Sequence, residues 1–65
     1  MRATSYKIVY DKNHVSNKGV SEPWSFELLD GKYVSYRSDS YTDEKYAVDQ
    51  AESILHEIKR AGGTL

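Results

Sequence analysis

The dipeptide Asp30-Gly31 lies between two segments, 24–28 and 32–37, in which large and polar residues alternate. Alternation with a period of two is typical of half-buried strands, and an Asp-Gly pair between two such segments indicates a β-hairpin. The turn then decides which side chains share a face, because a shift of one residue moves every side chain of a strand to the other face. This hairpin constrains the fold more than any other feature of the sequence.

Two turns fit the hairpin, and they distribute the apolar side chains differently. A two-residue turn, Asp30-Gly31, sets Phe26 opposite Ser35 and divides the apolar residues between the faces. A three-residue turn over 29–31, with Gly31 as a left-handed bulge, gathers the large residues on one face. We predict the three-residue turn because its register is the coherent one. The pairs that it predicts are Leu28/Lys32, Phe26/Val34, Trp24/Tyr36, Glu27/Tyr33 and Ser25/Ser35.

A helix is predicted over about residues 43–61. Thr42 is the expected N-cap, which makes Tyr41 and Tyr46 a hydrophobic staple at the start of the helix. Apolar residues recur at helical spacing, and the glycine pair at 62–63 ends the segment. The members of this apolar stripe are Ala47, Val48, Ala51, Ile54, Leu55, Ile58 and Ala61.

A further strand is predicted at about 5–10, followed by a loop at 11–23 that is rich in turn-forming residues. The expected fold class is α+β: one small domain, 1–65, in which a three-stranded antiparallel sheet packs on one face against a single C-terminal helix. The helix-covered face should hold Tyr6, Ile8, Tyr10, Trp24, Phe26, Leu28, Val34 and Tyr36. The opposite face should hold Lys7, Val9, Ser25, Glu27, Leu29, Tyr33, Ser35 and Arg37, and no segment is left to cover it.

The composition limits what stabilises such a domain. Only 13 of the 65 residues are Leu, Ile, Val or Phe, whereas six are Tyr, and there is no cysteine to form a disulfide or a thiolate metal site. A chain of this size buries only about 60% of the surface that its unfolded form exposes. We therefore expect a core that relies on aromatic rings.

Several classes of protein are excluded or disfavoured. No apolar run is long enough to span a membrane, and the N-terminal segment lacks the apolar region of a signal peptide, so a cytoplasmic protein is expected. A net charge of −1 argues against a strongly basic nucleic-acid binder.

The two histidines provide the only hints of chemistry. His14 is close in sequence to Asp11, and His56 follows Glu52 by one helical turn, but both are expected to be ordinary surface residues. No metal-ligand spacing, phosphate-binding loop or nucleophile motif is present. We therefore predict no enzyme activity, no catalytic residues, no cofactor and no metal.

The sequence resembles the YegP-like small bacterial domains over roughly residues 6–58. The resemblance is carried by Trp24-x-Phe26-x-Leu28, Gly31, Ser38-x-Ser40-Tyr41-Thr42, Ala47 and Ala51. It implies three strands and a helix, a bacterial or phage host, pairing into a larger assembly in some cases, and no known chemistry. The chain departs from the pattern in its 11–23 loop and lacks the second copy that some such proteins carry. The order of elements is also similar to that of HicB-type antitoxins and of the arm-binding domains of phage integrases.

The uncovered face of the predicted sheet is the main candidate for function. We predict a non-enzymatic module that binds a protein partner or a second copy of itself through this face and the 11–23 loop. The alternative is nucleic-acid binding on the same face, where Tyr33 would stack on a base and Lys7 and Arg37 would contact phosphates. The candidate residues are Lys7, Val9, Glu27, Leu29, Tyr33, Ser35 and Arg37.

Overall fold

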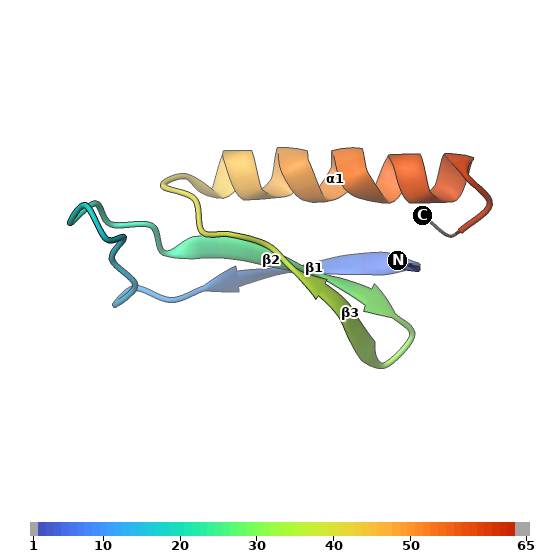
Figure 1. Cartoon of the computed structure of the whole chain (residues 1–65), viewed down its shortest axis with the longest axis horizontal. Helices are drawn as coiled ribbons and strands as arrows, with labels where there is room; N and C mark the ends of the chain where they lie inside the picture. The colour runs from blue at the N-terminus through green and yellow to red at the C-terminus, as the bar shows by residue number, and fades with distance from the viewer. Residues whose placement is uncertain (1, 64–65) are drawn as a thin grey trace.

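The computed structural model describes residues 2–63, which form three strands followed by one helix. The elements are β1 (Ser5–Tyr10), β2 (Trp24–Asp30), β3 (Tyr33–Arg37) and α1 (Glu44–Arg60). The strands form an antiparallel sheet in the order β1-β2-β3, and α1 lies along one face of it (Figure 1). The predicted α+β fold is confirmed.

The β2–β3 hairpin turns at a different place from the one predicted. Asp30 pairs with Tyr33, so the turn consists of the two residues Gly31 and Lys32. Gly31 has a φ of +63° at the first of these positions, where type II′ hairpin turns favour glycine. The predicted three-residue turn is wrong, and β2 continues to Asp30 because that residue belongs to the ladder.

A bulge in β3 replaces the predicted register. Leu28 pairs with Tyr36 and Leu29 pairs with Val34, so Ser35 is an extra residue without a place in the ladder. The Ser35 hydroxyl donates a hydrogen bond of 3.3 Å to the carbonyl oxygen of Leu28. Through this bulge Tyr36 stays on the helix-covered face, while Val34 joins Leu29 on the opposite face. The five predicted cross-strand pairs are therefore wrong.

The core is more aliphatic than the sequence predicts. Its buried residues are Ala3, Phe26, Leu28, Ala51, Leu55 and Ile58. Tyr10 and Tyr36, which were expected in the core, are 57% and 39% exposed. The Tyr10 ring instead packs on Trp24 at the margin of the sheet, with ring centroids 4.6 Å apart. Tyrosine thus surrounds the core rather than filling it.

The helix begins one residue later than predicted. Asp43 is the N-cap, with extended backbone and no hydrogen bond from its side chain, so Thr42 is not the cap. The expected staple is not formed, because Tyr46 is 59% exposed and Tyr41 instead stacks on Phe26 with ring centroids 6.3 Å apart. The N–H of Tyr41 also donates to the carbonyl oxygen of Trp24 at 2.6 Å.

The helix ends as the glycine pair predicts. Gly62, with a φ of +85°, donates its N–H to the carbonyl oxygen of Lys59, and Gly63 donates to that of Ile58. These two bonds form a Schellman motif, which satisfies carbonyl groups that the last turn leaves unpaired. Ala61 is the C-cap and is exposed, so it does not extend the buried stripe.

Candidate functional site

The face of the sheet opposite α1 carries most of the predicted site. The register places five of its seven candidates there: Lys7, Val9, Glu27, Leu29 and Arg37. Val34 and the serines at positions 5 and 25 complete this surface, which we call the open face. No helix or strand within residues 2–63 packs against it, because α1 contacts the sheet only from the other side (Figure 1).

A row of charged side chains crosses the open face. Lys7 lies directly opposite Glu27, which lies opposite Arg37, so one residue from each strand contributes to the row. Arg37 Nε lies 3.0 Å from Glu27 Oε2, and the side chain of Glu27 is only 18% exposed. Because Glu27 lies beside Arg37, its negative charge offsets the positive charge that a phosphate would meet there.

Two of the seven candidates do not belong to the open face. Tyr33 pairs with Asp30, next to Leu29 in β2, so alternation places it on the other side of the sheet from Arg37. Ser35 occupies the bulge and bonds to a backbone carbonyl. The structure therefore does not gather the cluster of Lys7, Tyr33 and Arg37 on which the nucleic-acid hypothesis depends.

The bulge brings Val34, which was predicted in the core, to the open face. Val34 is 41% exposed and lies directly opposite Leu29, so that the two form an apolar pair beside the charged row. No pattern in the sequence distinguishes this register, because Val34 and Tyr36 are both large residues spaced for one face.

The 11–23 loop doubles back on itself beyond the ends of β1 and β2 (Figure 1). Val15 bridges Ser21, and the N–H of Ser16 donates to the carbonyl oxygen of Val20 at 2.8 Å. Gly19 closes the turn with a φ of +79°. An open groove of about 520 Å³ lies between this loop and residues 38–40.

The hydrogen bonds of His14 hold the 11–23 loop in its folded shape. Its Nδ1 donates to the carbonyl oxygen of Glu22 at 3.0 Å, and its backbone N–H donates to the carbonyl oxygen of Asp11. The Asp11 carboxylate accepts the N–H of Asn13 at 3.1 Å. These bonds stabilise the loop and engage the His14 imidazole and the Asp11 carboxylate with other groups, rather than with each other as acid–base catalysis would need.

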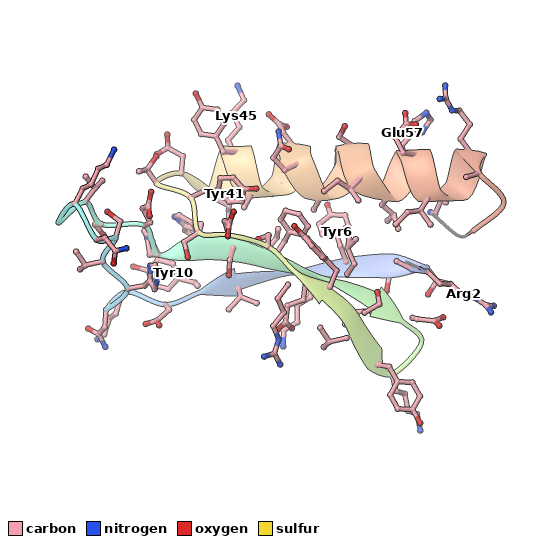
Figure 2. All side chains as sticks on the ribbon, viewed as in Figure 1. Arg2, Tyr6, Tyr10, Tyr41, Lys45 and Glu57 are labelled. Carbon is pink, nitrogen blue, oxygen red and sulfur yellow. The ribbon has the colours of Figure 1, made fainter. Side chains whose placement is uncertain are left out.

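Glu52 on α1 is engaged by β1 rather than by His56. The Tyr6 hydroxyl donates to Glu52 Oε1 at 3.1 Å, which joins the edge strand to the helix. Figure 2 shows Tyr6 between the sheet and α1. This hydrogen bond, together with desolvation and the negative charge of Glu52, raises the pKa of Tyr6 above its usual 10.0. The pKa of Tyr41 is also raised, first by burial and then by nearby Tyr36 and Asp39.

Residues 2–63 contain no cluster of three or more His, Asp or Glu side chains arranged to hold a metal ion. Within the same range, α1 is neither long nor apolar enough to cross a bilayer. Comparisons with protein-family models, with curated proteins and with solved structures give no match. The resemblance to YegP-like domains therefore stays a prediction, and the proposals that follow depend on the geometry of this chain.

Proposed function

We propose that this chain is a non-enzymatic protein-interaction module and that the open face is its binding surface. The observation that carries the proposal is the apolar pair Leu29/Val34 on a face that no helix or strand within residues 2–63 covers. Antiparallel sheets commonly leave one face to solvent, but such a face is then usually polar. Here it has apolar residues on both sides of a charged row.

The composition of the open face suits a protein partner better than a nucleic acid. Interfaces between proteins combine an apolar centre with polar groups at the rim. Leu29 and Val34 supply the first, and the Arg37–Glu27 ion pair and Lys7 supply the second. Binding to nucleic acid depends on several unpaired cations at the backbone phosphates, and only Lys7 fits that description among the candidates on this face.

The 11–23 loop extends past the end of the sheet. We therefore limit the proposed binding surface to the open face and leave the loop out of it. The absence of enzyme activity is part of the proposal. It is supported by the roles of His14 and Glu52, whose side chains are used in hydrogen bonds that hold the fold together.

The proposal is tested by placing a photo-crosslinking amino acid, p-benzoylphenylalanine, at position 34 of the full chain in living cells. Val34 is exposed enough to accept the larger side chain. We expect irradiation to give discrete protein adducts, which mass spectrometry would identify. The matched control carries the same amino acid at position 53, an exposed site on α1.

Two outcomes would contradict the proposal. The first is a lack of adducts at position 34. The second is the same set of adducts at positions 34 and 53, because this would report collisions rather than a binding surface.

A further inference from the structure

The free edge of β1 presents backbone groups that nothing within residues 2–63 satisfies through sheet pairing. β1 is the outer strand of the sheet, so one of its sides faces β2 and the other faces solvent. Trp24 exchanges backbone hydrogen bonds with Tyr41, and Phe26 donates to the Ser38 hydroxyl while its carbonyl accepts the Ser38 N–H. Both residues of β2 therefore point their backbone groups away from β1.

The direction of the backbone groups of β1 follows from this observation. Tyr10 lies opposite Trp24, and Ile8 lies opposite Phe26. In an antiparallel pair, residues opposite each other either exchange both hydrogen bonds or neither, and the two kinds alternate. Tyr10, Ile8 and, by alternation, Tyr6 therefore direct their N–H and C=O groups to the free edge.

The two edges of the sheet differ in how well they are protected. Natural sheets protect edges with bulges, prolines, charges or a covering segment. β3 has the bulge at Ser35, whereas β1 pairs with β2 in an unbroken register over all six of its residues. β1 contains no proline, and its one charged residue is Lys7. It is therefore the edge that can extend the sheet.

We propose that β1 pairs in antiparallel fashion with β1 of a second copy of this chain, about a two-fold axis at Ile8. This inference goes beyond the proposed function, because the second copy pairs with the edge of the sheet and leaves the open face uncovered. The two copies would form one sheet of six strands, three from each, with both helices on the same face. The outward groups of Tyr6, Ile8 and Tyr10 would then form roughly six backbone hydrogen bonds with their counterparts.

The register follows from the backbone groups and the side chains. An axis at Ile8 sets Tyr6 opposite Tyr10 of the other copy, so every outward residue meets an outward residue. It also sets Lys7 opposite Val9 of the other copy. An axis at Lys7 would place two lysines directly opposite each other, which is unfavourable. An axis at Val9 would use only Ile8 and Tyr10 of each strand.

The position of α1 is compatible with this arrangement. α1 packs over β1 and β2, and neighbouring strands lie about 4.8 Å apart. A two-fold axis at the free edge of β1 then places the two helices about 10 Å apart, which is the usual distance between packed helices. The flank of α1 that would meet the second helix is the one on which Glu52 accepts the hydrogen bond from Tyr6. That flank contains a hollow of about 210 Å³ beside Leu55.

The proposed pairing joins one six-residue strand to its counterpart. A contact of this length is small beside the roughly 800 Å² per partner of a standard stable interface. We therefore expect a reversible dimer that dissociates on dilution.

Sedimentation velocity of the full chain, from micromolar to millimolar concentrations, tests the dimer. A charged residue at position 9 tests the pairing. In the dimer, position 9 of each copy lies opposite Lys7 of the other copy, so each substitution acts at two symmetric contacts. Val9→Asp is expected to tighten the dimer and Val9→Lys to weaken it, each by roughly three- to tenfold in dissociation constant. Opposite effects of two charged residues at one site cannot arise from a general loss of folding.

Cysteine cross-linking tests the register, since the native chain contains no cysteine. Under mild oxidation, a mixture of Lys7→Cys and Val9→Cys chains should form disulfide-linked heterodimers, while Val9→Cys alone should not cross-link efficiently. Efficient cross-linking of Val9→Cys alone would overturn the axis at Ile8. A strictly monomeric chain at millimolar concentration would overturn the dimer itself. Neither result affects the adducts expected at position 34, so the failure of this inference is distinguishable from failure of the proposed function.

Discussion

β2 and β3 are neighbours in one sheet, but they are stabilised in different ways. In β2, Phe26 is 1% exposed and Leu28 is completely buried beneath α1. All five residues of β3 are exposed, and within residues 2–63 this strand makes no packing contact with the helix. Figure 1 shows β3 slanting away from α1 toward the hairpin turn. Burial beneath α1 therefore holds β2, whereas β3 is held by its pairing with β2.

The substitution with the largest expected effect is Phe26→Ala in β2. Removing a buried phenylalanine side chain costs about 3–5 kcal/mol, because the apolar contacts are lost and a cavity remains. A domain of this size has little more stability than that to lose. We therefore expect the variant to be largely unfolded at room temperature, which circular dichroism would show directly.

The matched substitution in β3 is Tyr33→Ala. Tyr33 is 79% exposed, so its removal should change the free energy of unfolding by less than about 0.5 kcal/mol. Urea unfolding at low protein concentration measures this value. A large loss of stability in this variant would show that β3 depends on side-chain packing and would break the comparison.

The next largest effect is expected at Ser38, where β3 ends and the chain returns to β2. The Ser38 hydroxyl accepts the N–H of Phe26 at 2.9 Å and donates to the carbonyl oxygen of Asp39 at 2.7 Å. Ser38→Ala leaves the partly buried N–H of Phe26 without this acceptor, which should cost about 1–2 kcal/mol in urea unfolding. Ser38→Thr keeps a hydroxyl and should restore most of the loss. Equal losses in the two variants would indicate that the hydrogen bond is unimportant.

The elements of the fold were predictable because each has a local cause. The amphipathic stripe predicts α1, and its stop at Gly62 follows from the left-handed conformation that glycine adopts readily. The register of the hairpin was not predictable from alternation, since the bulge at Ser35 changes the face of every residue beyond it. The bulge allows Gly31 to occupy the turn while Tyr36 still pairs with Leu28 on the helix-covered face.

The candidate site was partly predictable for the same reason. Lys7, Val9 and Glu27 lie in the regular β1–β2 ladder, where period-two alternation holds, and they share the open face as expected. Tyr33 and Val34 lie between the bulge and the turn, and each lies on the opposite face from the one predicted. The free edge of β1 is a property of the tertiary structure, because it depends on which strand occupies the centre of the sheet.

A smaller effect is expected at Gly62, which ends the helix that covers β2. Its φ of +85° lies in the left-handed region, which costs a residue with a side chain about 1–2 kcal/mol. Nothing lies within 4 Å of the position of an added Cβ, so Gly62→Ala isolates this backbone cost. We expect urea unfolding to show a loss of about 1 kcal/mol. Ala61→Ser, at the exposed C-cap, is the control and should be nearly neutral.

The smallest effect concerns the hydrogen bond from the Tyr6 hydroxyl to Glu52, which fastens β1 to α1. The raised pKa of Tyr6 means that folding favours its protonated form, so the associated stability is present below the ordinary pKa of 10.0 and is lost as the pH rises through the folded value. The stability of the native chain should therefore fall as the pH rises above 10.0.

Tyr6→Phe tests this pH dependence because it keeps the ring and removes the hydroxyl. The variant should be slightly less stable than the native chain near neutral pH, and its stability should fall less steeply at alkaline pH. Tyr41 retains its own raised pKa, so some of the alkaline loss should remain in the variant. The measurement is the shift of the urea midpoint between neutral pH and a pH just above 10.0. Identical shifts in the two proteins would mean that the Tyr6–Glu52 bond does not hold the edge strand to the helix.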